Sequence, residues 1–134
     1  MNALDLAYIP IAAATAPWWA FKKRRGWKER FGVLPKLAPP AGKPRLMIHA
    51  VSVGEVNALR HLIPILRDEF DLVVSASTDT GLARANELYS QVCSVIRFPL
   101  DFSWAVARLL DAAMPDAVAL VELEVWPNFV RECT

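Results

Sequence analysis

Cysteine, histidine and glycine are all scarce in this chain of 134 residues, which contains two, two and five of them respectively. Cys93 and Cys133 lie far apart, and neither belongs to a Cys-x-x-Cys pair or a His–Cys cluster. Structural zinc needs such ligands at short spacings, so the sequence predicts no metal site. Two separate thiols fit a reducing compartment better than an oxidising one.

The scarcity of glycine excludes a second class of site. Phosphate-binding loops need several glycines after a strand, in patterns such as G-x-G-x-x-G or G-x-x-x-x-G-K-[ST]. Residues 52–55 follow the first expected strand and have the sequence S-V-G-E, which fits neither pattern. We therefore predict no dinucleotide or ATP site and no cofactor in this part of the protein. The net charge of +1 gives no general attraction for nucleic acid, and no Ser-His-Asp arrangement is evident.

Apolar residues, in contrast, make up 54% of the chain, and their excess is concentrated at the amino terminus. Residues 1–21 carry one charged side chain, Asp5, and are about as long as the roughly 20 residues that cross a bilayer. Pro10 and Pro17 interrupt this segment, but proline is tolerated in membrane helices. We predict a membrane anchor or an interfacial helix over residues 1–21. A cleaved signal peptide and a buried core helix are the alternatives, although no basic residue precedes the apolar stretch as a signal peptide requires.

Six basic residues follow this apolar segment within nine positions: Lys22, Lys23, Arg24, Arg25, Lys28 and Arg30. Such a cluster beside an apolar segment favours attraction to anionic lipid headgroups, and a solvated surface is the alternative. Its position predicts that the domain after it lies in the cytoplasm. Residues 22–44 combine this basic segment with a linker that contains four prolines between positions 35 and 44.

From residue 45 onward, short apolar runs alternate with segments of helical periodicity. The expected strands cover residues 45–51, 71–77, 93–98 and 117–122. The expected helices cover residues 55–70, with a bend at Pro64, then 81–89, 102–114 and a last one that begins near Pro127. The strands are too continuously apolar to have a solvated face, so we predict an α/β fold with a doubly wound, Rossmann-like parallel sheet over residues 45–134. The chain stops within its last helix, which is typical of a truncated domain.

Ligands of open parallel sheets bind beyond the carboxyl ends of the strands, so the residues that follow each strand are the site candidates. Glu55 is the first, because Gly54 beside it permits a tight turn and close approach of a ligand, and a carboxylate there could act as a general base. However, S-x-x-E over residues 52–55 is also a capping-box pattern, which would satisfy the first amides of a helix. Periodicity alone favours the capping interpretation.

The other candidates follow the second and fourth expected strands. Thr78, Thr80 and Gly81 precede a helix and could hold an anion, although N-capping by Thr78 or Asp79 is the favoured interpretation. Glu122 and Glu124 could orient a sugar or raise each other's pKa, or they could be exposed surface residues. His49, within the first expected strand, is interpreted as a core histidine.

Four segments in this order resemble signatures of the Kdo (3-deoxy-D-manno-octulosonic acid) transferases. Residues 49–55 (H-A-V-S-V-G-E) resemble H-A/S-V-S-V-G-E, and residues 78–81 (T-D-T-G) are similar to T-P-T-G. Residues 98–101 (F-P-L-D) resemble L-P-x-D, and residues 121–128 (V-E-L-E-V-W-P-N) resemble E-T-E-L-W-P-N. Residues 26–32 are also similar to the basic stretch after the membrane anchor of these enzymes. The resemblance covers nearly the whole chain.

This resemblance implies a GT-B glycosyltransferase whose amino-terminal domain binds a lipid A precursor and whose carboxyl-terminal domain binds the donor CMP-Kdo. It implies attachment to the bacterial inner membrane on the cytoplasmic face, and inverting, metal-independent transfer. Glu55 would be the general base, one of Glu122 and Glu124 a second functional carboxylate, and Ser52, Gly54, Thr78, Thr80 and Gly81 would bind the acceptor.

Three positions depart from the family pattern: Asp79 replaces proline, Leu123 threonine and Val125 leucine. Asp79 adds negative charge where an acidic acceptor should approach, which weakens the case for an anion site in this loop. The donor domain also lies outside these residues, so the chain alone is expected to be inactive. The alternatives are another GT-B glycosyltransferase and a non-catalytic, membrane-anchored binding module.

Overall fold

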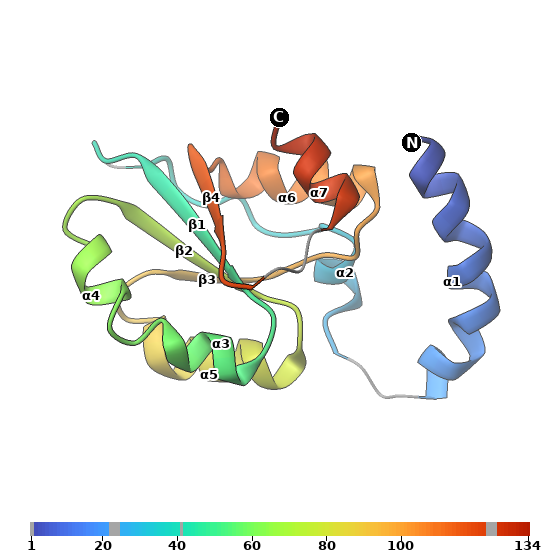
Figure 1. The fold of residues 1–134 in the computed structure, drawn as a ribbon, viewed down its shortest axis with the longest axis horizontal. Coiled ribbons are helices and arrows are strands. Elements are labelled where there is room, and N and C mark those ends of the chain that lie inside the picture. Colours follow the sequence, from blue (N-terminus) through green and yellow to red (C-terminus); the bar gives the residue numbers. More distant parts are fainter. Residues whose placement is uncertain (1, 22–24, 41, 123–125) are drawn as a thin grey trace.

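The computed structural model describes residues 2–21, 25–40, 42–122 and 126–134 of the chain. A four-stranded sheet forms the centre of the molecule, and a long amino-terminal helix stands at one end of it (Figure 1). The strands are β1 (Arg45–Ala50), β2 (Asp71–Ala76), β3 (Ser94–Arg97) and β4 (Ala117–Leu120). All pairings are parallel, in the order β3-β2-β1-β4, which confirms the predicted parallel α/β sheet.

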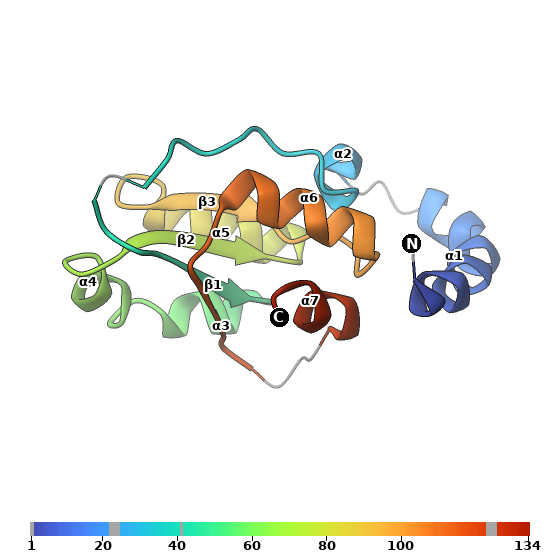
Figure 2. The same ribbon diagram turned by 90° about the horizontal axis from the view of Figure 1, so that it is seen from above.

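The helices lie on both faces of the sheet, as the continuously apolar strands predicted (Figure 2). Because side chains alternate along a strand, β1 sends Ile48 to one face and Met47 to the other. The first face is covered by α3 (Val53–Ala58), α4 (Ile63–Leu66) and α5 (Asp79–Tyr89), and the second by α6 (Ser103–Ala113) and α7 (Pro127–Glu132). Each face therefore has its own apolar core.

The single bent helix expected over residues 55–70 is wrong, because the chain forms two short helices, α3 and α4, with a turn between them. Pro64 lies in the first turn of α4. Proline lacks an N–H and disfavours helical geometry in the residue before it, but the first turn of a helix needs no such donor. Pro64 therefore begins a helix here instead of bending one.

Strand β4 departs from the prediction of strands buried on both faces. The inner strands β1 and β2 are almost wholly buried, whereas Ala117 and Ala119 of β4 are exposed. β4 forms one edge of the four-stranded sheet, so its outward side has no neighbouring strand among the described residues. The expected and observed ends of the other strands differ by one residue, within the usual variation of such assignments.

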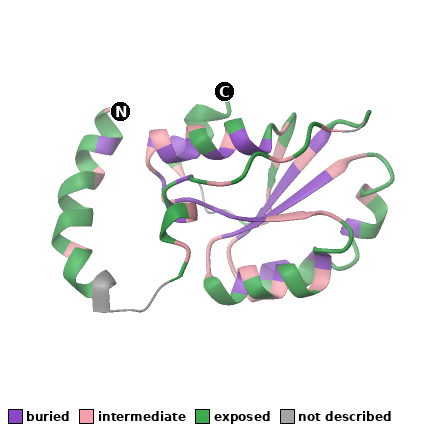
Figure 3. Ribbon diagram, turned by 180° about the vertical axis from the view of Figure 1, so that it is seen from behind, coloured by how far each residue is buried: buried purple, intermediate pink, exposed green. Residues whose placement is uncertain are grey.

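Helix α1 (Ala3–Phe21) forms where the apolar segment was predicted, and most of its described side chains are exposed (Figure 3). Leu6 and Ile11 are about 60% exposed, although both are large and apolar. A helix that is apolar on all sides is typical of a protein core or a membrane span. Even so, none of the helices in the described ranges is both long and apolar enough to cross a membrane.

Candidate functional site

The candidate site lies where the loops after β1 and β2 meet at the carboxyl edge of the sheet. Val51 follows β1, and its carbonyl oxygen accepts hydrogen bonds from both the amide and the hydroxyl of Thr78, which follows β2. This pair of bonds fixes the two loops to each other. The structure thus brings together the first two groups of predicted site residues, those around Glu55 and those around Thr78.

Glu55 lies in the first turn of α3, and its carboxylate is turned back toward the end of β1. Its Oε2 accepts the Val51 amide at 2.6 Å, and its Oε1 accepts the Ser52 amide at 3.2 Å and the Ser52 hydroxyl at 2.9 Å. The side chain is 9% exposed. The capping interpretation is therefore confirmed for the chain as it stands.

The capping hydrogen bonds do not occupy every acceptor site of the Glu55 carboxylate. An ionised carboxyl group offers about four lone-pair sites, and the three bonds to Glu55 occupy two on Oε1 and one on Oε2. The remaining site on Oε2 has no partner among the described residues. Because both oxygens are held by short loop contacts, this open site has a fixed position. The arrangement can accept a proton or a hydroxyl hydrogen bond at one defined atom.

Gly54 was expected to permit a tight turn and the close approach of a ligand, and the structure shows that no tight turn depends on it. Gly54 does not adopt a positive φ, and a Cβ built on it would meet only Ser52 Oγ, at 3.8 Å. The space above Gly54 is therefore open, which leaves room for a ligand beside the Glu55 carboxylate but does not require glycine.

His49 lies beneath this site, in β1, and is 2% exposed. Its ring stacks on Phe98 with centroids 3.9 Å apart, Nδ1 lies 2.9 Å from Ser75 Oγ, and Nε2 lies 3.4 Å from Ser77 Oγ. Burial lowers the pKa of His49 to about 4, and the charge of Glu55 offsets only part of this effect. The interpretation of His49 as a neutral core histidine fits this environment.

The two threonines of residues 78–81, here called the threonine loop, differ in their contacts: the hydroxyl of Thr78 is hydrogen-bonded, whereas that of Thr80 makes no hydrogen bond among the described residues. Thr78 Oγ1 donates to the Val51 carbonyl and accepts the Gly81 amide at 3.0 Å, so it caps α5. A Cβ on Gly81 would lie 2.7 Å from Thr78 Oγ1 and 3.2 Å from the Val51 carbonyl oxygen, so only glycine allows α5 to approach this closely. Thr80, in contrast, is exposed and its hydroxyl has no partner among the described residues.

Glu122 is exposed just after β4, and Glu124 lies outside the described residues. Glu122 makes no described contact with residues 51–55. Their assignment as a second functional carboxylate stays a prediction.

The motif residues Asp101 and Asn128 make structural contacts. Asp101 is buried and accepts the amides of Asn128 and Phe129, the second and third residues of α7, at 3.0 and 2.9 Å. The Asn128 side chain donates to the Asp101 carbonyl oxygen and to Asp5 of α1. Burial raises the pKa of Asp101, with a smaller contribution from the charge of Asp5, although the two amides act against it.

Asp5 stands out in the sequence only as the one charge in an apolar segment. It is fully buried, and it accepts the backbone amide of Ser103 at 2.8 Å and the Ser103 hydroxyl at 2.5 Å. The amino end of α1 is thereby joined to the amino end of α6. A lone carboxylate in an otherwise uncharged helix was the available signal for such a contact. Within the ranges that the structure describes, no group of three His, Cys, Asp or Glu side chains could hold a metal ion.

Comparison with known proteins gives a consistent result for most of the chain. Residues 25–134 match the family model described as 3-Deoxy-D-manno-octulosonic-acid transferase (kdotransferase). A 3-deoxy-D-manno-octulosonic acid transferase of Chlamydia trachomatis is 34% identical over 110 residues, which are 79% of this chain and 25% of the relative. Proteins of the same name from Haemophilus influenzae and Bordetella pertussis are 27% and 30% identical over 96% and 84% of this chain, and 30% and 29% of their own lengths. The chain thus spans between a quarter and a third of the length of these relatives.

Proposed function

This chain belongs to the 3-deoxy-D-manno-octulosonic-acid transferase family, and we propose from that premise that it forms the acceptor-binding part of a Kdo transferase. The complete enzyme would have the GT-B fold and would transfer Kdo from CMP-Kdo to a lipid A precursor during lipopolysaccharide synthesis. The parallel sheet with helices on both faces supports a Rossmann-like amino-terminal domain. The donor would bind to a carboxyl-terminal domain, which these residues do not include.

The open lone-pair site on Glu55 Oε2 is the observation that carries this proposal. In the reaction, an acceptor hydroxyl donates to this oxygen and loses its proton to it as the hydroxyl oxygen attacks the anomeric carbon of Kdo. The bond from that carbon to CMP breaks, and the anomeric centre inverts. General-base catalysis of this kind contributes roughly 100- to 10,000-fold in rate. The bonds from Val51 and Ser52 supply the orientation that such a base needs.

Attachment to the cytoplasmic face of the bacterial inner membrane is part of the proposal. The exposed apolar side chains of α1 would enter the lipid, and the basic segment after it would face anionic headgroups. Trp27 of α2 (Trp27–Arg30) and Phe31 just after it add exposed aromatic area, and their rings stack with centroids 6.0 Å apart. Aromatic and basic residues together are typical of membrane interfaces.

The first test is binding by the 134-residue chain itself. Isothermal titration with vesicles that contain a lipid A precursor should show binding above that to vesicles with an equal density of phosphatidylglycerol. CMP should not bind, because the donor domain is absent. Tight binding of CMP to this chain would overturn the assignment of the acceptor part.

The second test addresses the chemistry. The 134 residues would replace the matching segment of the Haemophilus influenzae relative, and the fused protein would be assayed for Kdo transfer. Glu55→Gln should lower turnover by roughly 100- to 10,000-fold while the protein stays folded, with a loss of about 1 to 3 kcal/mol because the amide nitrogen cannot accept the bonds that a carboxylate oxygen accepts. Glu69→Gln, at an exposed carboxylate outside the sequence motifs, is the matched control. Full activity of Glu55→Gln would favour a non-catalytic binding module instead.

A further inference from the structure

A pocket of about 420 Å³ opens beside the threonine loop, and its lining includes Arg25, Asp79, Thr80, Asn86 and Arg97. Two arginines and a carboxylate in one small pocket indicate a site for a charged group. Neither the capping of α3 nor the proposed proton transfer uses any of these five residues.

Two buried arginines converge on Asp79 at the edge of this pocket. Arg30 Nη2 lies 2.9 Å from Asp79 Oδ1, and Arg97 Nη1 lies 2.7 Å from the same oxygen. Both arginine side chains are more than 90% buried, whereas Asp79 is 44% exposed. Burial alone would raise the pKa of Asp79, but the hydrogen bonds and charges of Arg97 and Arg30 outweigh it, so the pKa lies below its usual value.

Arg97 keeps donors that the protein does not use. A guanidinium group has five N–H bonds. Its Nε donates to Glu29 of α2 at 2.9 Å, and its Nη1 is buried and makes no hydrogen bond of good geometry, although it contacts Asp79. The two N–H bonds of Nη2 have no partner among the described residues. A buried cation with free donors at a pocket wall is suited to an anion.

The first turn of α5 adds further donors at this pocket. The amides of Asp79 and Thr80 and the hydroxyl of Thr80 have no hydrogen-bond partner in the part of the chain that the structure describes. Free amides at the start of an eleven-residue helix favour negative charge. Among the residues that the structure describes, Arg25 and Arg97 line the pocket together with one carboxylate, Asp79, and Arg30 and Glu29 contact these residues from beside it.

We propose that this pocket binds a phosphomonoester, and that the Asp79 carboxylate occupies part of the site as a resident anion that the phosphate must displace from Arg97. A phosphomonoester carries close to two negative charges and three acceptor oxygens, which match the free donors of Arg97, Thr80 and the first turn of α5. The proposal rests on the proposed function only for the natural ligand, which would be a phosphate group of the glycolipid acceptor. Asp79 then sets how strongly this chain holds that group.

The test uses inorganic phosphate and the 134-residue chain, with binding followed by the amide signals of Thr80, Ala83 and Asn86 in NMR spectra. Asp79→Asn keeps the side-chain shape and removes the resident charge, so it should tighten phosphate binding roughly tenfold or more. Arg97→Gln should abolish binding. Arg84→Gln removes the same charge from a residue of α5 that does not line the pocket, and it should leave binding unchanged.

A second arm identifies the source of the phosphate. Vesicles of phosphatidylcholine with phosphatidic acid, a phosphomonoester lipid, should perturb the same amides, and vesicles with phosphatidylglycerol, a diester, should not. If only free phosphate acts, the site takes a soluble phosphomonoester and the lipid assignment fails.

Three results would overturn the site itself. These are equal phosphate affinity of Asp79→Asn and the unaltered chain, equal weakening by Arg97→Gln and Arg84→Gln, and phosphate-induced shifts scattered over the surface. The last result is measured on the unaltered chain, so it tests the anion site even if a variant fails to fold. None of these measurements involves Kdo transfer, so the anion site can fail while the proposed function stands, and the reverse.

Discussion

Two polar clusters with buried carboxylates lie at the carboxyl edge of the sheet: the first holds one carboxylate, Glu55, and the second holds two, Asp5 and Asp101. In the first cluster, Glu55 caps the short helix α3 and keeps one acceptor site open on Oε2. In the second, Asp5 and Asp101 cap α6 and α7, and Asn128 links them to each other. Both clusters contain residues of the family motifs, but Glu55 is held by the backbone just before its own helix, whereas Asp5 and Asp101 are held by the amides of other helices.

We therefore expect that burial and a motif position do not by themselves make a carboxylate functional. Asp5 accepts an amide from the first residue of α6, and Asp101 accepts two amides from the first turn of α7. Removal of either carboxylate would therefore leave buried donors without acceptors. Glu55 is held by the loop that precedes its own helix, and the space above Gly54 is open. The second cluster should therefore control stability, and the first should control chemistry. The following predictions test this division, from the largest expected effect to the smallest.

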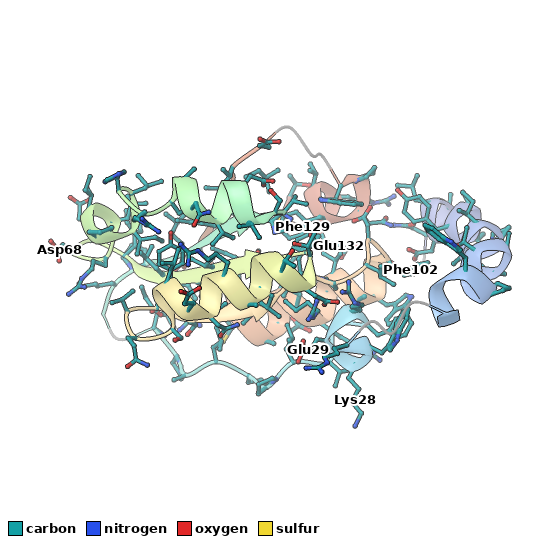
Figure 4. All side chains as sticks on the ribbon, turned by 90° about the horizontal axis from the view of Figure 1, so that it is seen from below. Lys28, Glu29, Asp68, Phe102, Phe129 and Glu132 are labelled. Atoms are coloured by element: carbon teal, nitrogen blue, oxygen red, sulfur yellow. The ribbon has the colours of Figure 1, made fainter. Side chains whose placement is uncertain are left out.

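Asp5→Ala should lower the free energy of unfolding most. It leaves the buried amide and hydroxyl of Ser103 without their acceptor. A buried donor without a partner costs about 1 to 3 kcal/mol, so we expect a loss of roughly 4 kcal/mol in urea unfolding of the 134-residue chain. Asp68→Ala, at an exposed carboxylate at the opposite end of the molecule from α1, is the control (Figure 4). A loss below about 0.5 kcal/mol would mean that α1 is not part of the folded domain.

His49 should make the chain less stable as the pH falls. Its pKa is about 4 in the folded state and takes the ordinary histidine value of 6.5 in the unfolded chain, so between these values the unfolded chain binds a proton that the folded chain does not. The contribution is complete above pH 6.5 and is lost as the pH falls toward 4. Each pKa unit corresponds to about 1.4 kcal/mol, so the loss amounts to roughly 3 kcal/mol.

This pH effect is measured by urea unfolding at several pH values. His49→Gln should flatten the dependence between pH 6.5 and 4, and His61→Gln, at the exposed histidine, should not. If the unaltered chain and His49→Gln show the same dependence of stability on pH, the pKa of His49 is not lowered by folding.

Gly81→Ala should cost about 1 to 3 kcal/mol, because the added Cβ meets Thr78 Oγ1 at 2.7 Å and forces the two loops apart. Gly54→Ala is the matched control, since its Cβ enters open space within a helix and should be neutral or stabilising. In the fused transferase, Gly81→Ala should also reduce turnover, because it displaces the loop that Val51 and Thr78 hold together. Equal unfolding temperatures of the two variants would contradict the close approach of α5.

The sequence was sufficient for the order and type of nearly all elements, because the apolar runs of β1 and β2 and the periodicity of α6 are strong local signals. The prediction failed at Pro64, because a proline can either bend a helix or begin one, and the local sequence pattern does not distinguish the two. It also left Glu55 undecided between capping and catalysis, since both use the same spacing. The contacts of Asp5 and the convergence of Arg30 and Arg97 on Asp79 join residues far apart in the chain, and no local pattern encodes them.

Ser52→Ala has the smallest expected effect on stability and separates the two roles of Glu55 most directly. It removes one of the three donors to the carboxylate, the hydroxyl at 2.9 Å, and leaves both backbone amides. Loss of an N-cap hydroxyl costs about 1 kcal/mol, so the chain should stay folded.

In the fused transferase, Ser52→Ala should lower kcat and leave the KM for the acceptor unchanged, because Glu55 is then oriented less firmly as a base. If Ser52 contacts the acceptor directly, its replacement should instead raise KM. Ser52→Thr keeps the hydroxyl and should restore kcat. If Ser52→Ala alters neither parameter, the two amides alone orient Glu55, and the hydroxyl serves only the helix.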